Sequence, residues 1–352
     1  MEFNAGTIEL MRALLGRVED GSSIEARLRD LRALQGELLM LLDGDVLRWL
    51  DTIPPATRDA AGDLYAGGGK RLRPLLAMLC GAAVAGEPAR ALPVATAVEL
   101  LHTGTLLHDD VVDEGEIRRG KPTARRVWGN ALAVLSGDFC YFAALDALLE
   151  HGDLAILQRA MKVARALSEG ELIQLQRRGR ADLGGEEAYM RVIDRKTASL
   201  FAFATWGGAR CAGLDGHALD AFDTYGRKLG LAFQVVDDIL DFAGDPASFG
   251  KALGHDVAEG TVTLPLAYAM EIDRALARDV ERLVADFAQG RPSEVDPASV
   301  VERVCASPAL ARSRDTATRL TREAIDALGD MQPSPHVEAL RTLAASLVKR
   351  VG

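Results

Sequence analysis

The sequence is poor in several features that would mark a particular class of protein. Aromatic residues make up only 5% of its 352 residues. Its four cysteines are widely separated, at Cys80, Cys140, Cys211 and Cys305. Cysteines spaced in this way match neither a zinc site nor a disulfide framework, so a reducing, cytoplasmic location is expected.

Long apolar runs and an excess of positive charge are also missing. No uncharged apolar stretch of about 18 residues occurs, so no transmembrane segment is expected. The apolar residues near Leu10–Leu15 are interrupted by Arg12, which argues against a signal peptide. The formal charge of −10 argues against a nucleic-acid partner, because such proteins usually present a basic face.

Helical periodicity fills most of the chain. Apolar residues recur at three-, four- and seven-residue steps, as at Ile24, Leu28, Leu31, Leu38 and Leu42. Short segments rich in Gly, Pro, Ser or Asp separate these stretches, at 51–57, 180–187, 244–250, 289–297 and 332–336. The pattern predicts an all-α fold with a single large domain of ten or more helices. We assign residues 1–45 to an N-terminal helical extension and 46–352 to the main domain.

Two acidic motifs of the form DDxxD stand out against this helical background. Their aspartates are Asp109, Asp110 and Asp113 in LLHDDVVDEGE, and Asp237, Asp238 and Asp241 in FQVVDDILDFAGD. On a helix the first and fifth positions of such a motif share one face. Carboxylates at that spacing repel each other, and a divalent cation would turn the repulsion into coordination.

The two motifs together predict bound Mg²⁺. A single acidic turn is at least as often solvated helix surface as a ligand site. Both motifs, however, lie among apolar residues such as Leu107, Val111, Val236 and Ile239. Because unpaired carboxylates are costly in apolar surroundings, metal ligation explains the pair better.

A glycine-rich basic segment, GGGKRLRP at 67–74, supplies the opposite charge. It is not a P-loop, because Leu64 stands at the first glycine position and Arg71 at the Ser/Thr position. Glycines followed by cations still suit a phosphate group. By itself the segment is a weak signal, since most basic helix starts are simply solvated.

In combination, these motifs resemble the trans-isoprenyl diphosphate synthases of the polyprenyl synthetase family. The match runs in family order through GGGKRLRP, ELLHTGTLLHDDVVDEGEIRRGKPTA, the Lys-Thr of DRKTASLF, FQVVDDILDF and GKALGHDVAEGTVTLPL. The resemblance implies the isoprenoid synthase fold with a central substrate cavity, three Mg²⁺ ions per active site and a homodimer. It also implies the reaction: an allylic diphosphate ionises, isopentenyl diphosphate attacks the cation, and a proton is lost.

The resemblance further implies roles for individual residues. The implied metal ligands are Asp109, Asp113, Asp237 and Asp241, and the catalytic set is Asp109, Asp110, Asp113, Lys196, Asp237 and Asp238. Positions that hold the allylic diphosphate correspond to Arg118, Lys196, Thr197, Gln234 and Lys251, and those for isopentenyl diphosphate to Lys70, Arg73, His102 and Arg119. Outside the family pattern, Lys196–Thr197 would read as a helix-surface pair and His102 as a satisfied core histidine.

Two positions bear on how this chain differs within the family. Where many members carry an aromatic residue that closes the chain-elongation tunnel, this sequence has Gly104, between Leu101 and Thr105. This predicts an open tunnel floor and a long, octaprenyl-type product. The alternative is that Gly104 only permits close helix packing while another side chain sets the floor. Thr261 stands where many members have a second lysine, which we interpret as tuning of the allylic site.

The leading hypothesis is a Mg²⁺-dependent synthase of long-chain, all-trans polyprenyl diphosphates. A short-chain (farnesyl or geranylgeranyl) synthase is one alternative. A second is a non-catalytic regulatory subunit of a heteromeric synthase, although such subunits usually have eroded aspartates. Terpene cyclases share one DDxxD but usually carry an Asn/Ser/Glu second motif, and the His108–Asp109 pair lacks the further ligands that a metal phosphohydrolase needs.

Overall fold

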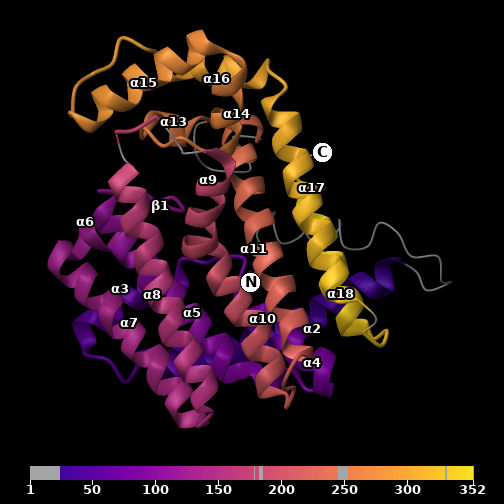
Figure 1. The fold of residues 1–352 in the computed structure, drawn as a ribbon. Helices are drawn as coiled ribbons and strands as arrows, with labels where there is room; N and C mark the ends of the chain where they lie inside the picture. Colours follow the sequence, from indigo (N-terminus) through magenta and orange to yellow (C-terminus); the bar gives the residue numbers. More distant parts are fainter. Residues whose placement is uncertain (1–23, 178, 182–184, 245–252, 330, 352) are drawn as a thin grey trace. The chain divides into compact units, whose positions relative to one another are not determined.

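The computed structural model describes residues 24–177, 179–181, 185–244, 253–329 and 331–351, with side chains described from residue 36 onward. Helices form nearly all of its regular structure (Figure 1), which confirms the all-α prediction. In the described part of the chain, the β-structure is limited to one antiparallel hairpin of β1 (Ile117–Arg118) and β2 (Lys121–Pro122).

The chain divides into two compact units. The first comprises residues up to Arg165, Leu200–Gly226 and Leu328–Leu343. Its helices are α2 (Ile24–Leu50), α3 (Pro55–Ala66), α4 (Leu72–Ala85), the 3₁₀ turn η1 (Pro88–Ala91), α5 (Leu92–Val112), α6 (Ala124–Trp128), α7 (Asn130–His151), and parts of α8 (Leu154–Arg177), α10 (Ser199–Cys211), α11 (Ala218–Ala243) and α18 (Pro335–Val348).

The second unit comprises Ala166–Ser199, Arg227–Ala327 and the residues from Ala344. Besides the remaining parts of α8, α11 and α18, it contains α9 (Gly185–Ile193), the π-helix η2 (Asp194–Ala198), α13 (His255–Ala258), α14 (Leu264–Ile272), α15 (Arg274–Ala288), α16 (Pro297–Cys305) and α17 (Ala309–Ala327).

Helix ends follow the local sequence. The helices α4 and α7 stop at Gly86 and Gly152, whose φ values of 74° and 85° lie in the left-handed region that glycine adopts without strain. The carboxylate of Asp273 caps α15 by accepting the N–H of Ala275 at 2.8 Å, and Asp296 caps α16 in the same way. Such caps satisfy donors that the first turn of a helix leaves unpaired.

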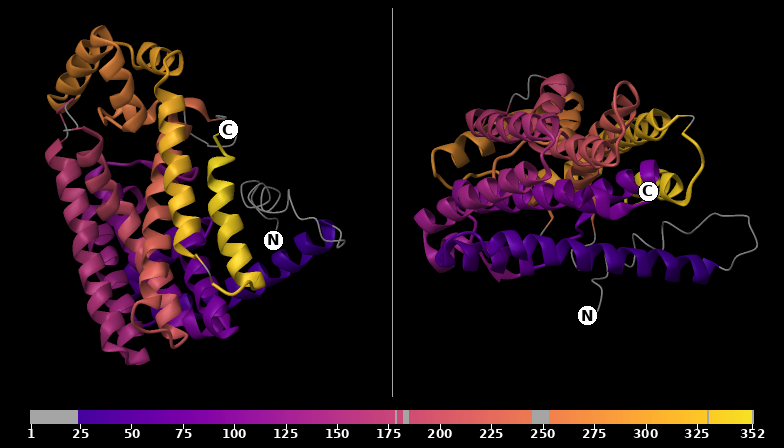
Figure 2. Two further views of the ribbon diagram at one scale, coloured as in Figure 1. Left: turned by 45° about the vertical axis from the view of Figure 1, so that its right-hand side comes forward. Right: turned by 90° about the horizontal axis from the view of Figure 1, so that it is seen from below.

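The long helix α2 runs without interruption over 27 residues (Figure 2). It therefore crosses the position 45/46 at which the sequence places the end of an N-terminal extension. The boundary itself stays a prediction, as does the role of the residues before it. Residues 51–54 of the predicted break at 51–57 separate α2 from α3, and residues 55–57 form the start of α3.

In the first unit α5 packs most extensively against α7. Two glycines allow their backbones to come together: a Cβ atom on Gly104 would lie 2.9 Å from the carbonyl oxygen of Gly137. A Cβ on Gly137 would lie 3.0 Å from the carbonyl oxygen of Gly104. Because any larger residue at either position would separate the helices, this contact fixes the segment of α5 that carries the first acidic motif.

By length and composition, α7 is the one helix among the described residues that could cross a membrane. It contains Asp138 and Asp146, and 44% of its most apolar window is buried inside the protein. Core helices of water-soluble proteins meet the same criterion, so α7 does not establish a transmembrane segment. All four cysteines are free thiols, which agrees with the expected absence of a disulfide framework.

Candidate active site

The first acidic motif lies at the end of α5. Asp109 and Asp110 belong to its last turn, and Asp113 follows it, with the N–H of Asp113 donating to the carbonyl of Asp109 at 2.8 Å. Asp110 is only 3% exposed, whereas Asp109 and Asp113 are half-buried. The motif thus presents its first and fifth carboxylates on one side and turns the second inward, as helix geometry requires.

The buried Asp110 is hydrogen-bonded to a residue that is predicted to bind the allylic diphosphate. The Nε atom of Arg118, on β1, donates to Asp110 Oδ1 at 2.7 Å. The other oxygen, Oδ2, is buried and accepts no hydrogen bond. Burial raises the pKa of Asp110, although the charge of Arg118 opposes the rise. An acceptor oxygen without a donor in so buried a place is suited to a cation or an ordered water.

Arg118 and Arg119 are adjacent at the hairpin turn, but their guanidinium groups contact different residues. Arg119 and Gly120 both have positive φ, 52° and 75°, as the two central residues of a type I′ turn must. The Arg119 guanidinium lies against the glycine-rich segment: a Cβ atom on Gly69 would be 3.1 Å from its Nη1. The glycine therefore lets this cation approach the backbone, which links two motifs that are far apart in the sequence.

His102 lies within the cationic cluster of the first unit. Nη1 of Arg73 lies 3.3 Å from His102 Nε2, and since arginine can only donate, Nε2 is the acceptor and the imidazole is neutral. Burial and the nearby arginines, Arg73 first, lower the pKa of His102 well below its ordinary value. Lys70 is exposed just before α4. His102, Arg73 and Arg119 therefore meet in one positively charged cluster.

Sequence reasoning missed the buried acid that balances this cluster. Glu99 is 3% exposed and pairs with Arg71, whose guanidinium also donates to the carbonyl of Tyr65 and lies 3.8 Å from the centre of the Tyr65 ring. A signal was present, because Glu99 precedes His102 by three residues and so shares its face of the helix. The sequence alone gives Arg71 no partner, since it shows only that Arg71 belongs to the basic segment GGGKRLRP.

Three residues of α5 are predicted to set product length: Leu101, Gly104 and Thr105. Leu101 is fully buried, and the Thr105 hydroxyl donates to the carbonyl of His102 at 2.7 Å. A Cβ atom on Gly104 would lie 2.7 Å from the ring of Tyr141. An aromatic ring of α7 therefore packs directly against Gly104, and the open tunnel floor stays a prediction. The sequence of α5 could not show what α7 contributes.

The second acidic motif lies on the part of α11 that belongs to the second unit. Asp238 is 3% exposed; it accepts the Tyr189 hydroxyl and, at 2.9 Å, the Nε2 of Gln234. Burial raises the pKa of Asp238 to about 7 despite these hydrogen bonds. Asp237 is half-buried, with Nη1 of Arg350 3.8 Å away.

The last aspartate of this motif has a structural contact as well. The Asp241 carboxylate accepts the backbone N–H groups of His255 and Asp256, each at 3.1 Å. The N–H of Thr261 donates to the carbonyl of Asp256 at 2.8 Å. Thr261, which stands where many family members have a lysine, is therefore hydrogen-bonded to a residue that also contacts Asp241. Lys251, predicted for the allylic diphosphate, lies outside the described residues.

Lys196 and Thr197 occur in the π-helix η2 rather than in an ordinary α-helix. The Thr197 hydroxyl donates to Gln234 Oε1 at 2.8 Å, which joins it to Asp238 through the Gln234 amide. Lys196 Nζ lies 2.5 Å from Glu171 Oε2, while Glu171 Oε1 is buried without a hydrogen bond. Glu171 is a second residue that sequence reasoning missed.

The donor set fits a divalent cation. Both motifs offer carboxylate oxygens, the ligands that Mg²⁺ prefers, and the unpartnered Oδ2 of Asp110 is the acceptor that a cation or its water shell would satisfy. A bound cation would supply charge stabilisation to a departing diphosphate. Within the described residues, no group of three His, Cys, Asp or Glu side chains is already gathered around a common point.

Each unit thus brings its own predicted residues together: Asp110 with Arg118 and His102 with Arg73 in the first, Thr197 with Gln234 and Asp238 in the second. An all-helical chain with two acidic helix motifs and a cationic cluster defines the class of isoprenoid synthases.

Comparison with known proteins gives the family. The model of the family described as Polyprenyl synthetase matches residues 54–298. Octaprenyl diphosphate synthase of Escherichia coli (strain K12) is 39% identical over 287 residues, 82% of this chain and 88% of that protein. Short chain isoprenyl diphosphate synthase of Methanothermobacter thermautotrophicus is 37% identical over 305 residues, 85% and 92% of the two chains.

A solved structure agrees. The polyprenyl synthase from Caulobacter crescentus CB15, complexed with calcium and isoprenyl diphosphate, aligns with a TM-score of 0.81 and 35% identity over 95% of this chain and 100% of that one. The chain belongs to the polyprenyl synthetase family and has its fold. It is a prenyltransferase, a trans-prenyl diphosphate synthase.

Proposed function

We propose that the protein is a Mg²⁺-dependent synthase that condenses an allylic diphosphate with successive isopentenyl diphosphates into a long-chain, all-trans polyprenyl diphosphate. The proposal rests on one observation: the two acidic motifs have the same pattern of burial and hydrogen bonding. In each motif the second aspartate, Asp110 or Asp238, is buried and hydrogen-bonded, while the first, Asp109 or Asp237, is half-buried. A non-catalytic subunit would have no use for two complete motifs in this state.

The roles assigned to the residues follow their chemistry. Asp109, Asp113, Asp237 and Asp241 hold Mg²⁺, and the buried Asp110 and Asp238 orient the helix ends that carry them. The cationic cluster of Arg73, Arg119 and neutral His102, together with Lys70, binds isopentenyl diphosphate. Arginine suits this role because its planar fork matches phosphate oxygens.

The residues proposed to bind the allylic diphosphate are those that the family resemblance implies. Lys196 and Thr197 offer a cation and a hydroxyl, and Gln234 holds the Thr197 side chain in place. Arg118 and Lys251 complete the predicted set. The two named relatives leave product length open, since one is an octaprenyl and the other a short-chain synthase at nearly equal identity.

One experiment tests this function. The purified protein is incubated with Mg²⁺, farnesyl diphosphate and radiolabelled isopentenyl diphosphate, and the products are dephosphorylated and sized by reversed-phase chromatography. We expect a ladder that extends well beyond twenty carbons. Products that end at fifteen or twenty carbons would identify a short-chain synthase. Cyclic hydrocarbons would identify a cyclase, and no transfer without an added subunit would identify a partner of a heteromeric enzyme.

We further propose that the protein is a homodimer and that α7 forms its interface. Leu135, Phe142 and Leu149 recur at intervals of seven residues and are 50%, 57% and 58% exposed. Residues at this spacing share one face of a helix, and such a face can pack on its own copy across a two-fold axis. The same outward apolar face gives α7 the hydropathy of a membrane span.

A further inference from the structure

The π-helix η2 carries the Lys-Thr pair, and its geometry needs an explanation. A π turn is rare and is less favourable than the α-helical turn that it replaces, so it persists where surrounding contacts hold it. Here the N–H of Ser199 donates to the carbonyl of Asp194, five residues earlier. Asp194 is thus the residue at which the wide turn begins.

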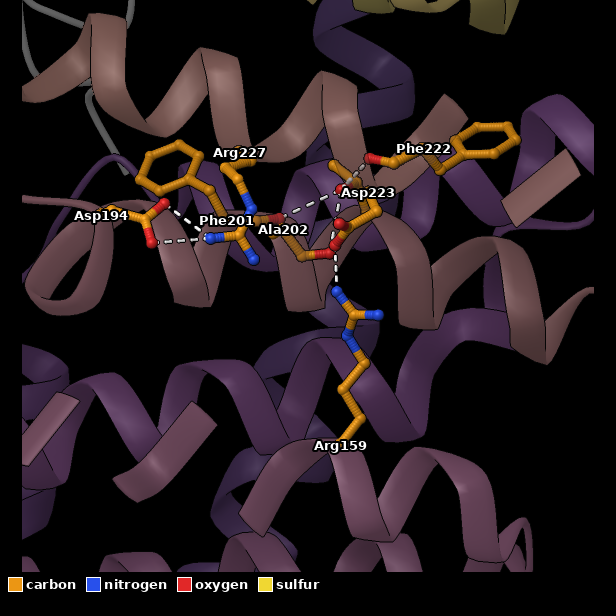
Figure 3. Close-up of polar contacts among 8 residues, drawn as sticks. Arg159, Asp194, Phe201, Ala202, Phe222, Asp223 and Arg227 are labelled. Atoms are coloured by element: carbon orange, nitrogen blue, oxygen red, sulfur yellow. Dashed lines mark hydrogen bonds and ion pairs between the residues drawn. The ribbon is translucent and has the colours of Figure 1, made fainter. Parts of the chain in front are cut away.

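The side chain of the same residue is tied to α11. Nη1 of Arg227 donates to both carboxylate oxygens of Asp194, at 2.6 and 2.8 Å (Figure 3). Further along α11, Gln234 accepts from Thr197 of the π-helix. Because Arg227 and Gln234 are seven residues apart, they share one face of α11, and both contact η2.

Three consecutive residues of α8 also contact the π-helix η2. Nε of Arg195 lies 3.6 Å from the Glu169 carboxylate, and Lys196 Nζ pairs with Glu171. Between them, a Cβ atom on Gly170 would lie 2.8 Å from the backbone nitrogen of Lys196. The backbone of η2 therefore lies directly on α8 at the point where the Lys-Thr pair begins.

From these contacts we infer that Asp194 and Arg227 are positioning residues: their ion pair holds the π-helix in register with α11, so that Lys196 and Thr197 meet the allylic diphosphate beside the second acidic motif. The inference rests on the proposed function for the identity of the ligand. Neither residue is assigned a contact with the substrate. Asp194 acts through the backbone turn that it starts, and Arg227 acts through Asp194.

Because the Asp194–Arg227 ion pair is partly exposed, its loss should change the position of η2 rather than the overall stability of the protein. The side chains of Asp194 and Arg227 are 30% and 38% exposed, and ion pairs this accessible to water contribute little to overall stability. A variant that loses the pair should therefore fold. A reorientation of the Lys-Thr turn, by contrast, would weaken every contact that it makes with a bound diphosphate.

The same helix offers a matched control. Four residues before Arg227, the carboxylate of Asp223 pairs with Arg159 of α8 (Figure 3), with side-chain exposures of 25% and 27%. This ion pair also joins α11 to another helix, and both of its residues lie outside η2. Asp223→Asn removes an ion pair of the same type that α11 makes with Arg159 of α8 rather than with η2.

The experiment compares the wild-type protein with Asp194→Asn, Asp194→Glu and Asp223→Asn. The steady-state kcat and the KM for farnesyl diphosphate and isopentenyl diphosphate are measured, together with the Kd of a non-hydrolysable farnesyl thiodiphosphate. Amide hydrogen exchange across residues 189–199 reports the order of the π-helix independently of activity. Circular dichroism confirms that each variant is folded.

For Asp194→Asn we expect the KM and the Kd for the allylic ligand to rise about tenfold or more, with faster exchange over η2 and an unchanged KM for isopentenyl diphosphate. Asp194→Glu, which keeps the charge, should recover most of the loss, and Asp223→Asn should match the wild type. The inference is overturned if Asp194→Asn binds the analogue as the wild type does, or if Asp223→Asn shows the same loss. An inactive wild type would instead refute the proposed function, while hydrogen exchange would still show whether the pair orders η2.

Discussion

The ring of Tyr141 on α7 occupies the space that a side chain at position 104 of α5 would fill, since a Cβ on Gly104 would lie 2.7 Å from it. The glycine that predicts an open tunnel floor is thus covered by an aromatic residue from a neighbouring helix. In this protein the aromatic ring that borders this part of α5 comes from α7. Gly104 thus permits close packing of α5 on α7, and substitution of Tyr141 tests which residue sets product length.

The first prediction concerns this ring. If the growing chain extends past Gly104, Tyr141→Ala will lengthen the product by at least one isoprene unit, because the space above Gly104 becomes open. Tyr141→Phe, which keeps the ring, will leave the distribution unchanged. Product sizing after incubation with farnesyl and isopentenyl diphosphates measures both. An active Tyr141→Ala enzyme with the wild-type product distribution would exclude Tyr141 as the floor.

The second prediction concerns the metal role of the first motif. Asp109→Ala should lower kcat by a factor of at least about a thousand, since loss of charge stabilisation at the departing diphosphate raises the barrier directly. Its circular dichroism and melting temperature should stay close to those of the wild type. Asp326→Ala, at an exposed position of α17, should keep full activity. Treatment with EDTA should silence the wild type and added Mg²⁺ should restore it; activity retained in Asp109→Ala would remove the role assigned here.

The third prediction follows from the lowered pKa of His102. The folded protein keeps this imidazole neutral, whereas the unfolded chain takes up a proton as the pH falls below about 6.5. Protonation therefore favours the unfolded state, and His102 makes the protein less stable from pH 7 towards pH 5. His102→Asn should lose less stability over that range, by up to about 1.4 kcal/mol for each pH unit below 6.5.

Urea unfolding of the wild type and His102→Asn at pH 7.5, 6.5 and 5.5 measures this difference. The comparison between the two proteins cancels the many carboxylates that titrate in both. Free energies of unfolding that change in parallel with pH would show that His102 is protonated in the folded state.

The fourth prediction concerns the α7 face. Phe142→Asp should convert the dimer into a monomer, because a carboxylate at the centre of an apolar interface would be left desolvated and unpaired. Light scattering coupled to size exclusion gives the mass directly. Ile272→Asp, which changes an equally exposed apolar residue on α14, should remain dimeric. A wild-type monomer, or a dimer that survives Phe142→Asp, would contradict the proposed interface.

Much of this protein could be predicted from its sequence, because the informative features are local. Periodicity alone gives helices, and helix geometry alone places the second aspartate of each DDxxD away from the first and fifth. The burial of Asp110 and Asp238 beside half-buried Asp109 and Asp237 agrees with that expectation. The order of the motifs was sufficient to identify the family, which the comparisons confirm.

The tertiary structure decided what depends on contacts between distant segments. Tyr141 covers Gly104, and Glu99 balances Arg71, because helices separated in sequence pack together. Asp194 starts a π turn while its carboxylate is paired with Arg227 of α11, and no local propensity distinguishes DRKTA from an ordinary helix. The sequence by itself determined which chemical groups this protein has, whereas packing determined which of them meet.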